Sequence, residues 1–198
     1  MNKLKLLALG VAFAATSGAA NAAVYYADKV IDSNYGTCTA SPSVCTSFDR
    51  KDPTNALGVT DGSFYSLGLG GDLTVGFAKA LFTATQKVVT FEITFGSVPK
   101  TEHFEAVDVY SILGGAETYL GRILNLTGIG QVTSSGPFEY IRLADATEDE
   151  YGAAGTTSSD GFDVDSVKIA PVPLPAAGGM LLLGMAGMAA LRRRKNAA

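Results

Sequence analysis

Apolar and polar side chains alternate with a period of two in the middle of the chain. From Val89 to Phe95 every second residue is valine, isoleucine or phenylalanine, and threonine or glutamate stands between them. Leu73, Val75 and Phe77 alternate with small or polar residues in the same way. Because successive side chains of a strand point to opposite sides, this pattern predicts two β-strands, each with its apolar face on a core and its other face in water.

Five further runs are rich in β-branched or aromatic residues, and clusters of glycine, proline, aspartate or serine separate them. They cover residues 24–31, 105–113, 117–124, 138–143 and 162–169. No long stretch carries the 3.6-residue period of a helix. About eight short strands at regular spacing predict an all-β fold, a single antiparallel β-sandwich whose simplest form is a jelly roll.

The first 22 residues have the three parts of a secretory signal peptide. Lys3 and Lys5 supply positive charge, residues 6–15 are apolar, and Ala20 and Ala22 fit the small-x-small rule of signal peptidase. We therefore predict that residues 1–22 are removed after Ala22 and that the rest is exported. An uncleaved N-terminal anchor is the alternative interpretation.

A second apolar stretch, from Ala176 to Leu191, contains no charged residue. As a helix it would be about 24 Å long, a little short of the roughly 30 Å hydrocarbon core of a bilayer. Four basic residues follow directly: Arg192, Arg193, Arg194 and Lys195. Cations at the end of a span resist translocation, so the pattern predicts a single transmembrane helix with its C-terminus in the cytoplasm and the bulk of the chain outside.

A proline motif precedes this span: Val172, Pro173, Leu174, Pro175 and Ala176. The motif, the apolar span and the basic tail together resemble the PEP-CTERM class of bacterial sorting signals in its VPLPA form, over residues 172–198. The resemblance implies an exosortase-type processing enzyme as partner, an inner-membrane-anchored precursor, and a mature protein at the cell surface or outside the cell, in association with exopolysaccharide or biofilm. A simple C-terminal anchor that is never processed is the alternative.

Between the two terminal segments, residues 23–171 have the length of one domain. All 19 acidic residues fall in this part, together with nine of the 15 basic ones, which gives a net charge of −10. Nucleic-acid binding requires clusters of lysine and arginine on the surface, so the charge excludes DNA and RNA as partners. It suits a secreted surface protein that uses divalent cations or simply stays soluble.

The chain contains two cysteines, Cys38 and Cys45, in a stretch rich in turn-forming residues. Export into an oxidising compartment predicts a disulfide between them. The loop that it closes is short, so the chain-entropy model gives a stabilisation of about 2 kcal/mol. A zinc or redox site would need further cysteine or histidine ligands at other spacings.

Three segments of the domain resemble exported bacterial surface domains that are similar to the galactose-binding jelly-roll superfold. They are residues 55–77, which contain the Ser-Leu-Gly-Leu-Gly-Gly turn before a strand, and residues 138–145 and 161–167, which look like the paired closing strands. The resemblance implies the fold. It leaves the function open, because this fold hosts lectin-like, enzyme-accessory and structural domains.

Candidate catalytic residues are few. His103 is the only histidine, and no Gly-x-Ser-x-Gly elbow supplies a nucleophile, so a serine hydrolase is excluded. The glycines from Gly68 to Gly71 lead into a strand and lack a following Lys-Ser or Lys-Thr, which indicates a turn and not a phosphate loop. We predict no catalytic residues. A glycoside-active enzyme with two carboxylates is the third-ranked interpretation, weakened by the absence of tryptophan.

Acidic residues gather near the end of the domain. Asp160, Asp163 and Asp165 lie within six residues, and Asp145 ends the strand that is expected to pair nearby. So many carboxylates repel one another unless a cation is present, and hard oxygen ligands suit calcium. The sequence therefore predicts a structural Ca²⁺ held by these four residues. No other cofactor is expected, and an acidic loop in water is the alternative.

These observations together predict an exported, non-enzymatic surface or extracellular-matrix protein. The alternative is a carbohydrate-binding module of the same fold. A concave patch of tyrosines and polar groups would favour that alternative, and scattered or buried tyrosines would weaken it. The tyrosines in question are Tyr25, Tyr26, Tyr65, Tyr110, Tyr119 and Tyr140.

Overall fold

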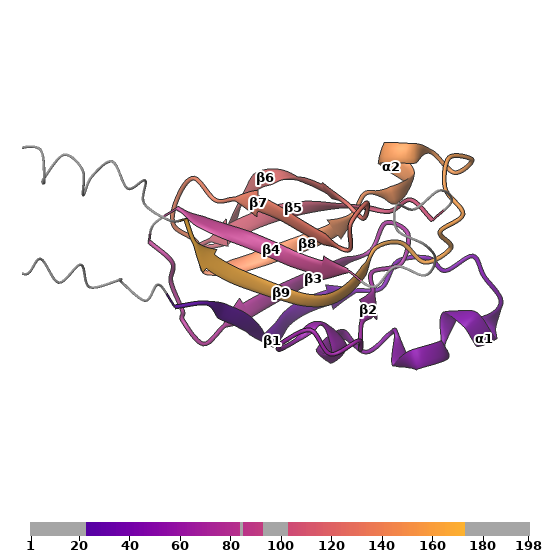
Figure 1. The fold of residues 1–198 in the computed structure, drawn as a ribbon, viewed down its shortest axis with the longest axis horizontal. Coiled ribbons are helices and arrows are strands. Elements are labelled where there is room, and N and C mark those ends of the chain that lie inside the picture. The colour runs from indigo at the N-terminus through magenta and orange to yellow at the C-terminus, as the bar shows by residue number, and fades with distance from the viewer. Residues whose placement is uncertain (1–22, 84, 93–102, 173–198) are drawn as a thin grey trace, which may run out of the picture.

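Strands carry most of the regular structure in the computed structural model, which describes residues 23–83, 85–92 and 103–172 (Figure 1). The strands of this part are β1 Tyr25–Asn34, β2 Tyr65–Ser66, β3 Asp72–Phe77, β4 Gln86–Glu92, β5 Ala106–Leu113, β6 Ala116–Leu124, β7 Ile129–Thr133, β8 Tyr140–Asp145 and β9 Asp163–Pro171. Two short helices, α1 Pro42–Cys45 and α2 Thr147–Tyr151, and two 3₁₀ turns, Ser47–Asp49 and Pro53–Ala56, lie in the loops.

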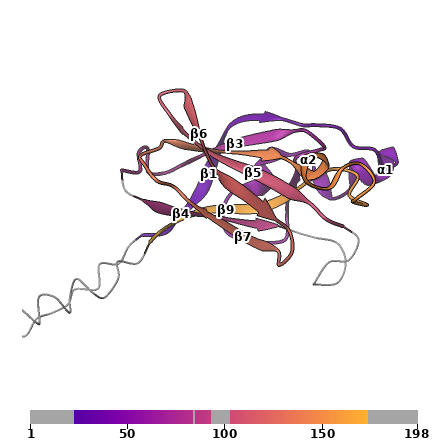
Figure 2. The same ribbon diagram turned by 90° about the horizontal axis from the view of Figure 1, so that it is seen from above.

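The strands form two layers that share β1 (Figure 2). One layer runs β6-β5-β8-β3-β1 and the other β1-β9-β4-β7, with every pair antiparallel, and β2 adds to β9. The pairing of β1 with β3 skips a residue between Ala27 and Lys29 and again between Val30 and Asp32. Such bulges bend a strand, which lets β1 pass from one layer to the other.

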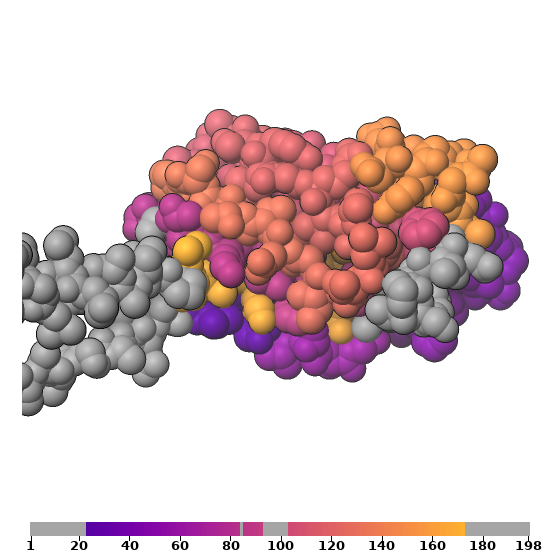
Figure 3. Space-filling model, turned by 45° about the horizontal axis from the view of Figure 1, so that its top comes forward, coloured from indigo at the N-terminus to yellow at the C-terminus, as the bar shows by residue number. Residues whose placement is uncertain are grey.

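The two end strands of this order, β6 and β7, lie against each other, which makes the sandwich nearly closed. In Figure 3, atoms in the salmon and coral colours that the bar gives to this part of the chain cover much of the face. The approach is so close that a Cβ on Gly130 would lie 1.8 Å from Cγ2 of Ile123. Glycine is therefore required at this position of β7. The predicted antiparallel β-sandwich is confirmed in its coarse architecture, although its strands form one continuous folded sheet and not two separate ones.

The core lies between the layers and is built from aromatic and branched side chains. Phe82 and Phe138 stack with ring centroids 4.9 Å apart, and Phe77 meets Phe82 edge-on at 5.6 Å. Leu73 and Ile141 are fully buried beside them. This apolar cluster joins both layers, so its burial is the main source of the domain's stability.

The alternation predicted for β4 is wrong in its direction. Val88 packs in the core and Thr90 and Glu92 share its side of the strand, all three buried, whereas Phe91 is partly exposed. Phe91 avoids full exposure because the Lys168 ammonium lies 4.6 Å from its ring centroid on the outer face. Glu92 consequently points into the molecule, and the predicted residues beyond it, 93–95, lie outside the described part.

The glycines from Gly68 to Gly71 form a turn, as predicted. The Gly71 amide donates to the Gly68 carbonyl at 3.0 Å, and a Cβ on Gly71 would lie 1.9 Å from the Leu67 carbonyl oxygen. The Gly68 amide donates to the Asp160 carbonyl at 2.8 Å. The turn therefore fixes the segment around Asp160 at the end of the sandwich.

The predicted terminal segments fall outside the described residues, apart from Val172. The signal peptide with Ala20 and Ala22, the proline motif from Pro173, and the basic cluster from Arg192 to Lys195 stay predictions. Within residues 23–83, 85–92 and 103–172, no helix is long and apolar enough to span a membrane.

Candidate functional site

Residues from α1, from the loop after it and from the start of β9 line a hollow of about 280 Å³. We call it the loop-end hollow. In Figure 1, α1 and α2 lie at one end of the sandwich, and β1 begins and β9 stops at the other end. Its buried lining residues are Arg50, Glu105, Asp160 and Asp163. Its more exposed lining residues are Val44, Ser47, Phe48, His103 and Ser159. Segments far apart in the sequence thus meet around one polar depression.

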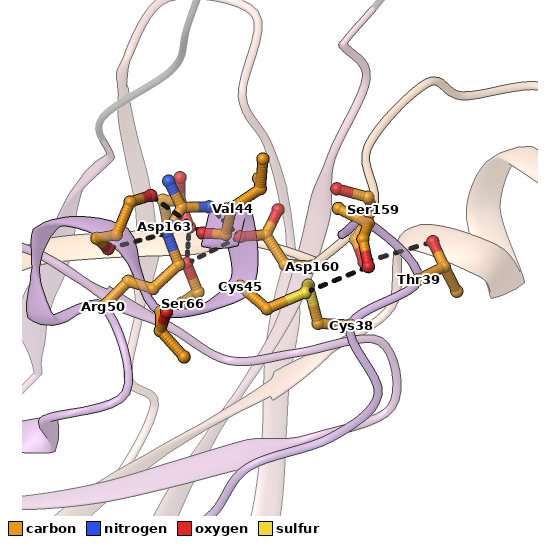
Figure 4. A network of polar contacts seen from close by, with 12 residues as sticks. Cys38, Thr39, Val44, Cys45, Arg50, Ser66, Ser159, Asp160 and Asp163 are labelled. Atoms are coloured by element: carbon orange, nitrogen blue, oxygen red, sulfur yellow. Dashed lines mark hydrogen bonds and ion pairs between the residues drawn. A yellow bond between two sulfur atoms is a disulfide. The ribbon is translucent and has the colours of Figure 1, made fainter. Parts of the chain in front are cut away.

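Arg50 and Asp160 form a buried ion pair in this hollow (Figure 4). The side chains are 6% and 7% exposed. The Ser66 hydroxyl lies within hydrogen-bonding reach of both Asp160 and Asp163, and the Arg50 guanidinium stacks 5.3 Å from the Phe64 ring centroid. A guanidinium fixed on both sides in this way is a rigid hydrogen-bond donor at low entropic cost.

Glu105 lies just before β5 and is held by Asn125. The Asn125 amide donates to Oε2 of Glu105 at 3.1 Å and to the His103 carbonyl at 2.9 Å, and its oxygen accepts from the Glu105 amide at 2.9 Å. His103 Nδ1 lies 2.6 Å from the Thr157 hydroxyl. This network holds a buried carboxyl and a half-buried imidazole on the same wall of the hollow.

Two of the buried carboxyls favour the protonated form. Burial raises the pKa of Glu105 well above the usual glutamate value, and the charges of Asp163 and Glu92 raise it further. Burial likewise raises the pKa of Asp163 well above the usual aspartate value, helped by the charge of Asp160 and opposed by the Ser66 hydroxyl. Both shifts go in the same direction, so these two carboxyls do not form the pair of opposed acid and base that glycoside hydrolysis uses.

Phe48 presents its ring at the rim of the hollow. The side chain is 70% exposed, the largest exposure among the large hydrophobic residues of the described part. Its backbone has φ of 59°, in the left-handed region that L-residues occupy at a cost of about 1–2 kcal/mol. Phe48 is therefore an exposed apolar side chain in a left-handed backbone conformation, next to the polar lining of the hollow.

The predicted disulfide between Cys38 and Cys45 is confirmed. It joins the segment after β1 to α1, and Val44, next to Cys45, lines the hollow. The Thr39 amide, next to Cys38, donates to the Ser159 carbonyl at 2.8 Å (Figure 4). The disulfide therefore fixes one wall of the loop-end hollow.

Replacing Cys38 by serine is expected to lower the free energy of unfolding by no more than about 2–3 kcal/mol, because the closed loop is short. Chemical denaturation of the oxidised parent and the variant measures the difference. Two reactive thiols in the unfolded, unreduced parent would contradict the disulfide itself.

The four aspartates predicted to hold calcium do not converge. Asp160 and Asp163 meet at Ser66, whereas Asp145 accepts from the amides of Gly70 and Phe162, each at 3.0 Å. Asp165 accepts from the amides of residues 61 and 62. Burial raises the pKa values of Asp145 and Asp165 above the usual aspartate value, although these hydrogen bonds act in the opposite direction.

Within the described ranges, no three His, Cys, Asp or Glu side chains are arranged to hold a metal ion. Structural calcium therefore stays a prediction.

The six tyrosines named above do not gather in one patch. Tyr65 is buried in the core, and Tyr25 packs edge-on against Phe82 at 5.4 Å. Tyr110 and Tyr119 form a pair on the outer face of β5 and β6, with ring centroids 5.3 Å apart. Tyr26 pairs with β9, and Tyr140 lies on β8. The tyrosine criterion therefore gives no support for a carbohydrate-binding patch.

Three residues of the loop-end hollow were not identifiable as site residues from the sequence. Phe48 and Arg50 stand in a short polar stretch without periodicity, and Glu105 begins an apolar run as an ordinary strand residue would. The one sequence feature that indicates the site is the pair of cysteines, because a disulfide at Cys45, three residues before Phe48, fixes the conformation of the neighbouring loop.

No protein-family model matches this chain, and a search of curated proteins finds no match. Among solved structures, one similar chain is the CBM32-3 carbohydrate-binding module from a family 31 glycoside hydrolase of Clostridium perfringens. It is 10% identical with a TM-score of 0.46, over 75% of this chain and 91% of that one.

The family 32 module of C. perfringens NanJ, in complex with galactose, is 16% identical with a TM-score of 0.39, over 59% of this chain and 83% of that one. A CBM35 from Paenibacillus barcinonensis is 13% identical with a TM-score of 0.32, over 76% and 99% of the two chains. Identities and TM-scores at this level carry no information on a ligand of the present chain.

Proposed function

We propose that residues 23–171 form a non-catalytic binding domain that takes a saccharide in the loop-end hollow. The observation that carries the proposal is the exposed ring of Phe48 at the rim of a rigid polar depression. Saccharide sites combine an apolar face, which packs on the C–H face of a sugar ring, with a few fixed polar groups that pair with hydroxyls. Phe48 supplies the first element, and Arg50, Asp160 and His103 supply the second.

The position of the hollow suits a protein attached through its C-terminus. The described chain ends at Val172 beyond β9, at the opposite end of the sandwich from the hollow (Figure 1). If the sorting signal of residues 172–198 functions as its resemblance implies, the hollow faces away from the membrane and toward extracellular material. The proposal therefore includes an exported protein of the surface or matrix that contacts exopolysaccharide and is processed by an exosortase-type enzyme. Mass spectrometry of the mature C-terminus tests the processing.

A glycan array probed with residues 23–171 tests the proposed function. We expect the domain to bind at least one saccharide. We expect the affinity of the Phe48→Ala variant for it to be lower by about tenfold or more, because a ring stacked on an aromatic side chain contributes on the order of 1–3 kcal/mol. Tyr119→Ala is the matched control, since Tyr119 is 53% exposed on β6, outside the hollow.

Binding that is lost in Tyr119→Ala and kept in Phe48→Ala would overturn the assignment of the site. Release of new reducing ends from a bound glycan would show an enzyme and overturn the non-catalytic part of the proposal.

A further inference from the structure

A second hollow, of about 330 Å³, lies beside the disulfide between Cys38 and Cys45. Both cysteines line it, and so do Tyr35 and Lys51. We call it the disulfide-side hollow. Ligand pockets in proteins usually have about 300–1,000 Å³. This hollow and the loop-end hollow, of about 280 Å³, are each near the lower end of that range, so either one alone suits a small ligand.

The chain from Pro42 to Lys51 lies between the two hollows. It consists of α1, the 3₁₀ turn after it and the two residues that follow. Its residues that line the loop-end hollow are Val44, Ser47, Phe48 and Arg50. Its residues that line the disulfide-side hollow are Pro42, Cys45, Thr46 and Lys51. Because residues three or four apart share one side of a helical turn, this short segment has one side in each hollow.

The wall of the disulfide-side hollow that follows β1 is rigid. The Gly36 amide donates to the Leu67 carbonyl at 2.8 Å, which ties this wall to the end of the sandwich. Tyr35 packs against the buried Tyr65 with ring centroids 6.3 Å apart. The disulfide joins this wall to α1. The hollow is therefore formed before a ligand arrives, and little conformational entropy is lost on binding.

Lys51 supplies hydrogen-bond donors to this hollow. Its ammonium nitrogen lies 4.4 Å from the Tyr35 ring centroid, and it is the one charged side chain among the described residues that line the hollow. Asp49 and Asp52 line a neighbouring depression together with Lys51. Their negative charges would repel an acidic sugar, so the donors of Lys51 suit the hydroxyl groups of a neutral one.

We propose that the saccharide site extends across this segment and takes a neutral oligosaccharide, or an internal stretch of a neutral polysaccharide, with one sugar residue in each hollow. The inference rests on the proposed saccharide function and names the class of ligand. Phe48, whose ring is 70% exposed, stands on the segment between the hollows, where a connecting sugar residue packs on it. A chain held in both hollows binds more tightly than a single sugar, because the second contact is intramolecular once the first has formed.

Isothermal titration of residues 23–171 with saccharides of increasing length tests the inference. The probes are galactose, glucose and N-acetylglucosamine, each with its β-1,4-linked disaccharide and tetrasaccharide, and tetragalacturonic acid. In a series that binds, we expect the tetrasaccharide to bind at least about tenfold more tightly than the monosaccharide.

Equal affinity for monosaccharide and tetrasaccharide would overturn the inference and leave the proposed function standing. Tighter binding of tetragalacturonic acid than of any neutral tetrasaccharide would do the same. Absence of binding in every series, and on the glycan array, would overturn both.

Lys51→Met is the decisive variant. Methionine keeps most of the apolar stem beside Tyr35 and removes the ammonium donors. We expect the affinity for the tetrasaccharide to fall about three- to tenfold, as for the loss of one hydrogen bond, so the gain from monosaccharide to tetrasaccharide shrinks by the same factor. Lys168→Met is the matched control, because the Lys168 ammonium also lies over a ring, that of Phe91, but outside both hollows. An unchanged gain in Lys51→Met, or an equal reduction in Lys168→Met, would contradict the extended site.

Discussion

Replacing Arg50 by methionine is expected to lower the free energy of unfolding by about 3–5 kcal/mol at neutral pH, the usual cost of removing one partner of a buried ion pair. The Arg50 and Asp160 side chains are both more than nine-tenths buried, and Asp163 lies next to them through Ser66. Without the guanidinium, the Asp160 carboxylate loses its counter-ion next to the Asp163 carboxyl group, in a poorly hydrated place. Methionine keeps most of the apolar stem, so the loss reports the charge and not the volume.

The loss should depend on pH in a definite direction. Burial already raises the pKa values of Glu105 and Asp163, so the folded parent binds more protons than the unfolded chain above the ordinary carboxyl range. The contribution of these two carboxyl groups to stability is therefore fully present below that range and is lost as the pH rises through the raised values. Arg50 lowers the pKa of Asp163, so its removal shifts that pKa further up, and the deficit of Arg50→Met should shrink in acid and grow toward neutral pH.

Urea denaturation of parent and variant across this pH range measures both effects. The double variant Arg50→Met/Asp160→Leu is the control, because replacing a buried ion pair by apolar residues is often close to neutral. The expected loss in free energy of unfolding is roughly 3–5 kcal/mol, so a loss below about 1 kcal/mol would contradict the ion pair. A loss that grows in acid would contradict it as well.

Replacing Phe48 by glycine is expected to raise stability and remove binding at the same time. Phe48 has φ of 59°, and glycine occupies this region without the clash that an L-residue suffers. The ring is 70% exposed, so most of its apolar surface gains nothing from burial in the folded domain. We expect the variant to be more stable by about 0.5–1 kcal/mol.

A thermal melt and a titration with the tightest saccharide from the array check the two parts. Phe64→Leu is a useful contrast, because Phe64 is buried and its loss should reduce stability. If Phe48→Gly melts well below the parent, the ring is a structural element and not a ligand platform. If it binds as tightly as the parent, the ring has no part in recognition.

Much of the fold follows from local patterns. The Leu73–Phe77 alternation and the apolar runs at 105–113 and 162–169 correspond to β3, β5 and β9, because a strand of a half-buried sheet needs that period. β7 and the two-residue β2 lack such a signal, since glycine and glutamine interrupt the first and the second is too short. Glu92 misleads for another reason: the face of β4 that the sequence assigns to water carries Val88 and Thr90 as well, and it is this face that is buried toward the core.

The candidate site is less accessible to sequence reasoning. The acidic segment at 160–165 does mark the right end of the sandwich, but the calcium prediction took four aspartates as one group. The register of β4 with β9 skips a residue between Phe91 and Glu92, which breaks the alternation of β9 and separates Asp163 from Asp165. Arg50 and Glu105 lie far from Asp163 in the sequence and meet it only in the folded structure, so no spacing rule connects them.

The most direct test of the central claim is to map the bound saccharide by NMR chemical-shift perturbation on isotopically labelled residues 23–171. The account predicts that the largest shifts fall on Phe48, His103, Ser159 and Asp160, around the loop-end hollow, and that the same sugar leaves Tyr110 and Tyr119 on the outer face unperturbed. Chemical-shift changes confined to the outer face of β5 and β6 would contradict it. So would the absence of any change with a saccharide that the full-length protein binds.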